Sequence, residues 1–168
     1  MSVNISPKQF LKENFVEHIR SVLQQTQLLP HQLDLEITEG VAVFNEQYTI
    51  DKLKQLKQLG VHISIDDFGT GYSSLSYLRK FPIDRLKIAK PFIDGMTEEK
   101  EDVAVVKAII VLAKNLKLRV IAEGVETLQQ LDILRSLQCD EIQGYVLGKP
   151  LPADGFEKTY MKNQLPNE

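Results

Sequence analysis

The chain has no tryptophan, only one cysteine and no long hydrophobic run. The single cysteine, Cys139, excludes a disulfide framework and a cysteine-based zinc cluster, and it fits a reducing compartment. Its apolar stretches stay well below the roughly 20 residues that span a bilayer, and its N-terminus is not signal-like. We therefore expect a soluble, cytoplasmic protein with no membrane segment.

The chain also has no excess of positive charge. The formal net charge is −3 and no basic face is evident, which argues against a general DNA- or RNA-binding protein. A phosphate-containing substrate stays possible, because metal ions held by carboxylates reverse the local field. The 168 residues, 43% hydrophobic and 26% charged, predict a single globular domain over residues 1–168 with a buried core.

Strand-like and helix-like segments alternate along the whole chain. Strands are expected at residues 2–6, 33–39, 61–65, 85–89, 118–122 and 141–146. Helices are expected between and after them, at residues 7–25, 50–59, 73–79, 102–115, 127–137 and 154–162. This alternation predicts an α/β fold with a parallel sheet.

Chemically capable side chains end every predicted strand. They are Asn4, Glu36, the pair Asp66 and Asp67, Lys87, Glu123 and Gln143. A (β/α) barrel gathers the carboxyl ends of its strands at one active face, whereas a doubly wound sheet uses a switch point only. We therefore predict a TIM-like barrel. Because such barrels have about 250 residues, six strand–helix units predict an incomplete one that lacks the two N-terminal units.

The adjacent carboxylates of Asp66 and Asp67 repel each other, and folding alone does not explain their place at a strand end. One interpretation is a solvated acidic turn followed by a helix cap. The other is a metal site, because hard divalent cations bind several carboxylate oxygens together. With Glu36, Glu123 and Asn4, these residues offer ligands for two ions, which suits in-line displacement at phosphorus.

Lys87 is expected inside the ring of strands, where a lysine is costly unless it faces carboxylates or a phosphate. From the residues alone, a metal-dependent lyase or isomerase with Lys87 as its base is a competing interpretation.

Five stretches resemble, in order and spacing, the successive motifs of EAL domains, which open cyclic di-GMP to linear pGpG with Mg²⁺ or Mn²⁺. They are Leu35-Glu36-Ile37-Thr38-Glu39, Asp66-Asp67-Phe68-Gly69-Thr70-Gly71-Tyr72-Ser73-Ser74-Leu75, Leu86-Lys87-Ile88, Ala122-Glu123-Gly124-Val125-Glu126-Thr127 and Gln143-Gly144-Tyr145. The resemblance covers residues 2–156, and residues 157–168 are expected to form a C-terminal helix and tail.

The resemblance also implies roles for individual residues. Metal ligands would be Asn4, Glu36, Asp66, Asp67 and Glu123, and the catalytic residues would be Lys87 and Glu123. Substrate or supporting contacts would come from Gln143, Glu126 and Glu39, with Glu39 anchoring the loop after Asp67. Two ions, Mg²⁺ or Mn²⁺, would be the cofactors and cyclic di-GMP the partner.

Two departures from the family pattern bear on activity. The Glu-Ala-Leu signature, which supplies a metal ligand, is absent, and Ala89 stands where the family usually has Asp. A degenerate module that binds cyclic di-GMP or a protein without catalysis is therefore the alternative function. We also expect self-association or a covering partner at the open sheet edges, and a preceding sensory or GGDEF-type domain in a full-length protein.

Overall fold

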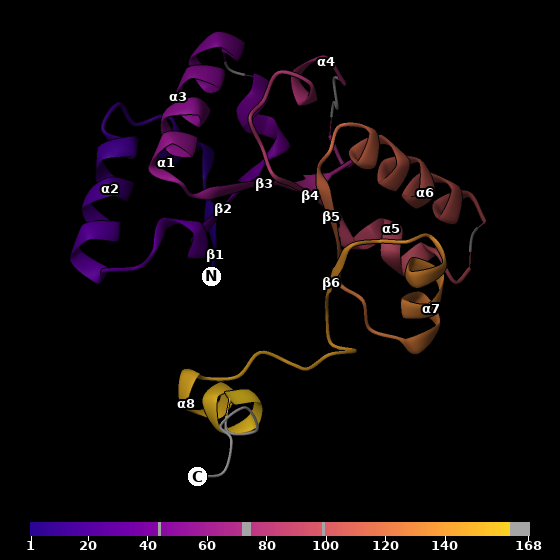
Figure 1. Cartoon of the computed structure of the whole chain (residues 1–168). Helices are drawn as coiled ribbons and strands as arrows, with labels where there is room; N and C mark the ends of the chain where they lie inside the picture. The colour runs from indigo at the N-terminus through magenta and orange to yellow at the C-terminus, as the bar shows by residue number, and fades with distance from the viewer. Residues whose placement is uncertain (44, 72–74, 99, 162–168) are drawn as a thin grey trace.

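The computed structural model describes residues 1–43, 45–71, 75–98 and 100–161. Six strands form one parallel sheet whose spatial order follows the chain (Figure 1). This sequential order is typical of a (β/α) barrel and confirms the predicted incomplete barrel. The strands are β1 Ser2–Ile5, β2 Asp34–Thr38, β3 His62–Phe68, β4 Arg85–Ile88, β5 Arg119–Glu123 and β6 Glu141–Gln143. The edges of the sheet are β1 and β6.

Helices connect the strands, as the alternation predicts. Figure 1 shows α2 and α3 beside the first strands and α5 to α7 beside the last ones. The α-helices are α1 Pro7–Phe10, α2 Phe15–Thr26, α3 Glu46–Leu59, α4 Leu75–Leu78, α5 Lys90–Gly95, α6 Lys100–Asn115, α7 Leu128–Ser136 and α8 Ala153–Phe156. Short 3-10 segments cover Pro30–Gln32 and Glu39–Val43, and a π-helical turn covers Glu157–Met161.

The first predicted helix is two helices, α1 and α2. Ser6 and Gln9 form the predicted capping box at its start. The break follows Phe10, where Lys52 of α3 donates hydrogen bonds of 2.8 Å to the carbonyl oxygens of Phe10 and Lys12. The buried ammonium thus satisfies carbonyls that would otherwise need a continuing helix.

Other elements also differ from the prediction. Helix α5 was not predicted, and it begins at Lys90 with a proline in its first turn. The last strand ends at Gln143 instead of Val146, because Gly144 passes against the backbone of Val125. The predicted helix start at Ser73, the predicted helix end at Lys162 and the tail after it lie outside the described residues.

Apolar side chains of the central strands are buried inside the fold. Burial on both faces is the usual condition of a parallel sheet, and it holds the strand ends in fixed positions. The innermost apolar strand residues, each at most 1% exposed, include Leu35, Ile37, Ile63, Ile65, Leu86, Ile88, Val120 and Ala122.

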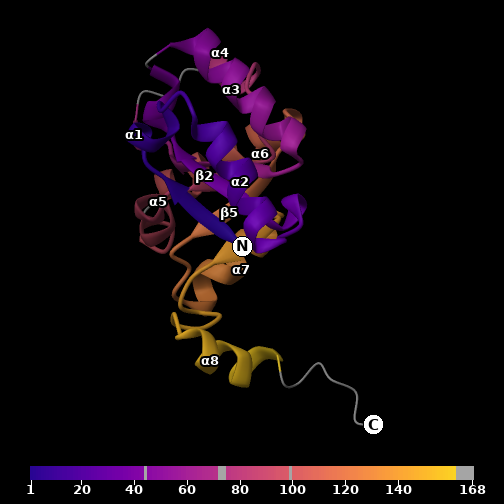
Figure 2. The same ribbon diagram turned by 90° about the vertical axis from the view of Figure 1, so that its left-hand side faces the viewer.

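The C-terminal segment is less well buried. Figure 2 shows α8 away from the sheet and the other helices, and Leu147, Leu151 and Phe156 are all exposed. Within the described part of the chain, none of the helices has the length and apolar character that a membrane crossing requires.

Candidate metal centre

The carboxyl ends of four neighbouring strands carry the central side chains of the site. Glu36 comes from β2, Asp66 and Asp67 from β3, Lys87 from β4 and Glu123 from β5. Parallel pairing brings these strand ends to one edge of the sheet, as a barrel requires of its active face.

Lys87 lies at the centre of this group. Its side chain is only 2% exposed, and its Nζ lies 2.6 Å from Glu36 Oε2, 2.6 Å from Glu123 Oε1 and 3.2 Å from Asp66 Oδ1. A buried ammonium is tolerated only with such partners. The expected position of Lys87 inside the ring of strands and against carboxylates is therefore confirmed.

Burial and pairing compete in setting the charges here. Burial alone would lower the pKa of Lys87, but hydrogen bonds to Glu123 and Glu36, with the nearby charges of Glu123 and Asp66, outweigh it and raise that pKa. Burial raises the pKa of Glu123, and Lys87 offsets only part of the effect. Lys87 is therefore charged at neutral pH, and Glu123 takes up a proton more readily than an exposed glutamate.

The backbone at Asp66 and Asp67 departs from regular strand geometry. Consecutive strand residues normally point to opposite faces, but Asp67 has a left-handed φ of 53°. The pairing of β3 with β4 also shifts register between Ile65 and Phe68. Both carboxylates consequently remain at the same end of the sheet. The sequence indicated the acidic pair, but not the backbone irregularity that presents it.

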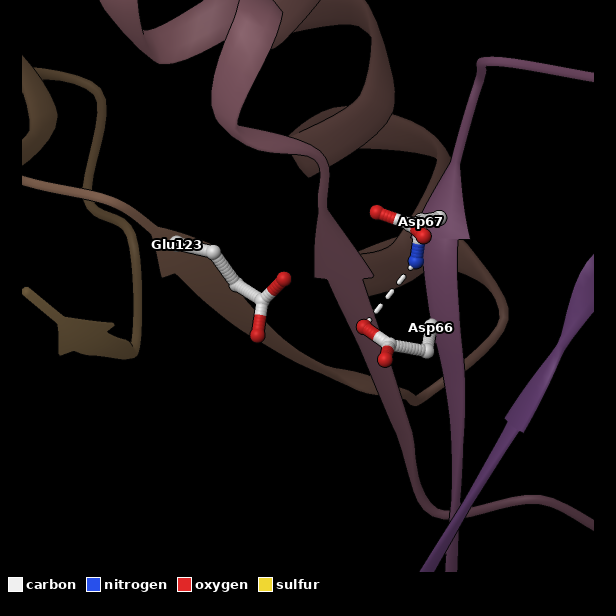
Figure 3. A group of neighbouring side chains, drawn as sticks. All are labelled: Asp66, Asp67 and Glu123. Carbon is white, nitrogen blue, oxygen red and sulfur yellow. Dashed lines mark hydrogen bonds between the residues drawn. The ribbon is translucent and has the colours of Figure 1, made fainter. Parts of the chain in front are cut away.

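Asp66, Asp67 and Glu123 form a group able to hold a cation. Figure 3 shows Glu123 and Asp66 on separate strands, with the backbone NH of Asp67 donating a 3.0 Å hydrogen bond to Asp66 Oδ1. One carboxylate oxygen from each residue lies within 4.8 Å of the other two. Carboxylate oxygens at this spacing fit a hard divalent ion such as Mg²⁺, Mn²⁺ or Ca²⁺.

The remaining predicted ligands lie around this group. Glu36 is buried beside Lys87 instead of joining the three-carboxylate cluster. Asn4 is exposed on β1, in register with Glu36 on β2. The amide of Asn4 thus stands at the open edge next to the buried carboxylate.

Glu39 lies behind the loop that follows Asp67. Its Oε1 accepts a 2.5 Å hydrogen bond from the hydroxyl of Tyr77, and its Oε2 faces Gly71, where a Cβ would approach to 3.2 Å. Glu39 is only 6% exposed. Glu39 thus lies between α4 and the backbone at Gly71.

Gln143 ends β6, and its carbonyl oxygen accepts a hydrogen bond from the backbone NH of Val125. The side chain is exposed and borders a hollow of about 360 Å³. The hollow continues into the C-terminal segment and is also lined by Tyr145, Lys149, Leu151, Phe156 and Tyr160.

Glu126 pairs with a residue that the sequence did not single out. Lys90 Nζ lies 3.0 Å from Glu126 Oε1 and 2.7 Å from Asp94 Oδ1, and Asp94 followed by Glu126 raises the pKa of Lys90. The i, i+4 spacing of Lys90 and Asp94 was a usable signal, but only once α5 was recognised as a helix.

Residues 1–150 match the family model of the EAL domain. The chain belongs to the EAL domain family. The resemblance carried by the five motifs is therefore confirmed, and the barrel expected for an EAL domain agrees with the sheet described above.

Named relatives connect the EAL domain to cyclic di-GMP. The chain is 44% identical to the bifunctional diguanylate cyclase/cyclic di-GMP phosphodiesterase MucR of Pseudomonas aeruginosa over 92% of its own length and 22% of MucR. The chain spans about a fifth of the length of these curated relatives.

Solved structures of EAL proteins give the same fold. A structure of the PaMucR phosphodiesterase in complex with c-di-GMP is 43% identical, with a TM-score of 0.89, covering 92% of this chain and 63% of that one. Klebsiella pneumoniae BlrP1 with manganese and cyclic di-GMP is 30% identical, with a TM-score of 0.78, covering 86% of this chain and 37% of BlrP1.

Ala89 stands two residues after Lys87, where an aspartate was expected from the pattern of the EAL family. It follows β4 directly, is fully buried and is the N-cap residue of α5. Its methyl group supplies neither a metal ligand nor a hydrogen bond. The EAL domain thus has Lys87, but not a carboxylate two residues further on.

Proposed function

We propose that this EAL domain hydrolyses one phosphodiester bond of cyclic di-GMP, giving linear pGpG, with Mg²⁺ or Mn²⁺ as cofactor. The observation that carries the proposal is the meeting of Glu36, Asp66 and Glu123 around buried Lys87, with Asp67 beside them. Cyclic di-GMP is a bound ligand in the PaMucR and BlrP1 structures.

In this proposal Asp66, Asp67 and Glu123 hold the ions, with Glu36 and Asn4 completing the ligand set. When bound, the ions would neutralise phosphate charge and favour ionisation of the attacking water. Lys87 fixes the orientation of Glu36 and Glu123 through its 2.6 Å contacts. Its positive charge also favours the negative charge that develops on the phosphate.

Proton transfer is assigned to Glu123. Its carboxylate lies at the end of β5 beside those of Asp66 and Asp67, where it would accept a proton from a bound water. Glu39, fixed by Tyr77 of α4 and facing Gly71, is proposed to hold the loop after Asp67. Gln143 and Glu126 are proposed to contact or position the nucleotide from the neighbouring strand ends.

The alternative is an EAL module that binds cyclic di-GMP without turning it over. Buried Ala89, in place of the expected aspartate, is the observation that favours it. A missing carboxylate next to a metal site typically costs about 10–100-fold in metal affinity or activity.

Binding and product assays of the unmodified chain distinguish the two functions. We expect it to bind cyclic di-GMP in the presence of Mn²⁺ and to release pGpG, measured by chromatography of the nucleotides. Removing the ion with a chelator is expected to stop pGpG formation, because the carboxylates alone do not supply the positive charge that the phosphate needs. Micromolar binding without pGpG formation would instead support the binding module.

We also propose that a second copy of the chain covers the β1 edge. Val3 is exposed on this strand, and a groove of about 350 Å³ beside it is lined by apolar residues of β1, β2 and α2. Uncovered strand edges pair readily with other chains.

Val3→Lys is expected to shift the chain toward monomer, because a charged side chain on an edge strand opposes pairing. Sedimentation velocity over a range of concentrations measures this shift. Val111→Lys, at an exposed valine of α6, is the matched control and should sediment like the parent chain. A parent chain that stays monomeric at high concentration would refute the proposed interface.

A further inference from the structure

The loop after Glu123 has an unusual backbone and a close neighbour. Gly124 has a left-handed φ of 70°, and a Cβ at this position would lie 2.5 Å from Cγ of Lys90 and 2.7 Å from its Cδ. These atoms belong to the inner part of the lysine side chain, which cannot swing away easily. The aliphatic stem of Lys90 therefore packs directly against the backbone that follows the proposed proton acceptor.

The same lysine also reaches the far end of this loop. Its Nζ lies 3.0 Å from Glu126 Oε1, while Asp94, one turn further along α5, holds it from the other side at 2.7 Å. All three charged side chains are about half exposed, so the ion pairs alone contribute little energy. Packing of the stem on Gly124 does not depend on the charge of Lys90.

Hydrogen bonds hold the rest of the loop. The NH of Glu126 donates to Gln130 Oε1 at 2.8 Å, and Gln130 Nε2 donates to the Ile93 carbonyl of α5 at 3.1 Å. The NH of Val125 donates to the Gln143 carbonyl at 3.1 Å. Helix α5 therefore contacts the loop directly through Lys90, and is linked to it indirectly through Ile93 and the Gln130 side chain of α7.

We propose that Lys90 is a positioning residue for Glu123. Its stem fixes the left-handed turn at Gly124, and this turn sets the direction in which Glu123 leaves β5 toward Lys87 and Asp66. The effect of Lys90 on metal binding and hydrolysis rests on the proposed function, in which Glu123 is a metal ligand and proton acceptor. The contact between Lys90 and Gly124 is present in the chain without any metal ion.

Lys90→Ala removes the stem, and two controls accompany it. Lys90→Met keeps most of the stem without the charge, and Lys107→Met changes an exposed lysine of α6. The first measurement is amide hydrogen exchange at Val125 and Glu126 in the metal-free chain. We expect exchange to be about tenfold faster in Lys90→Ala, because the loop opens more often. Both methionine variants should stay within about twofold of the parent if packing of the stem dominates.

The second measurement is Mn²⁺ affinity, followed by electron paramagnetic resonance. Lys90→Ala is expected to bind Mn²⁺ about tenfold more weakly, as for other residues that orient metal ligands, while both methionine variants bind like the parent. Parental exchange and affinity in Lys90→Ala would overturn the inference, and so would equal losses in Lys90→Met. A lower melting temperature with unchanged Mn²⁺ affinity would reduce Lys90 to a stabilising residue and also overturn it.

Failure of the proposed function gives a different result. A parent chain that binds no Mn²⁺ and forms no pGpG refutes the proposed function, whatever the variants do. The exchange measurement still tests in that case whether the Lys90 stem holds the loop after Glu123, because it requires neither metal nor nucleotide.

Discussion

Replacing Lys87 with methionine is expected to lower the free energy of unfolding of the metal-free chain by about 3–5 kcal/mol. Methionine matches the length of the lysine stem but removes the ammonium that contacts Glu36, Asp66 and Glu123. Three buried or half-buried carboxylates then face one another without a cation. Breaking a buried ion pair from one side leaves such charges uncompensated, which is why the expected loss is large. Urea unfolding at neutral pH measures it.

The loss should depend on pH. Without Lys87, the pKa of Glu123, already raised by burial, rises further, because the ammonium that offset part of this effect is gone. The folded variant then binds more protons than the unfolded chain, so its stability falls as pH rises. Lys87→Met is therefore expected to differ least from the parent near pH 5 and most near pH 8.

Mn²⁺ should restore part of the lost stability, because an ion bound by the carboxylates replaces the missing charge. The matched control is Lys52→Met. Lys52 is also buried, at 5% exposure, but its ammonium contacts the Phe10 and Lys12 carbonyls and the hydroxyl of Tyr48. Its loss should show neither the pH dependence nor the rescue by Mn²⁺. Equal behaviour of the two variants would contradict an electrostatic role of Lys87.

Much of this arrangement was predictable from the sequence. Parallel strands recur every few tens of residues and end in polar side chains, so the shared edge that unites Glu36, Asp66 and Glu123 follows from topology alone. Lys87 was predictable as well, because a lysine within an apolar strand needs carboxylate partners. The EAL motifs in the sequence also indicate the family.

What could not be predicted depends on contacts between segments distant in sequence. The break between α1 and α2 follows from Lys52, which lies 42 residues after Phe10. The left-handed backbone of Asp67 and the register shift of β3 come from pairing with β4. Lys90 gains its importance only through Gly124, on another strand end. Local propensity carries no information about such contacts.

Replacing Asp66 with asparagine is expected to reduce pGpG formation in Mn²⁺ by at least about 100-fold, or about 2.7 kcal/mol of transition-state stabilisation. Asparagine has nearly the same shape but lacks the negative charge that pairs with Lys87 and attracts the ion. Asp66 also belongs to the three-carboxylate group with Asp67 and Glu123. A loss of this size with an unchanged fold would show that the charge of Asp66, and not its packing, supports the reaction.

The fold of Asp66→Asn should survive, since Lys87 keeps its closer partners Glu36 and Glu123 at 2.6 Å. Mn²⁺ binding should weaken together with pGpG formation, because both need the same carboxylate. Asp132→Asn, at an exposed aspartate of α7, is the matched control and should retain parental turnover. If Asp66→Asn and Asp132→Asn formed pGpG equally well, hydrolysis would have to occur elsewhere than at the carboxyl ends of β3 and β5.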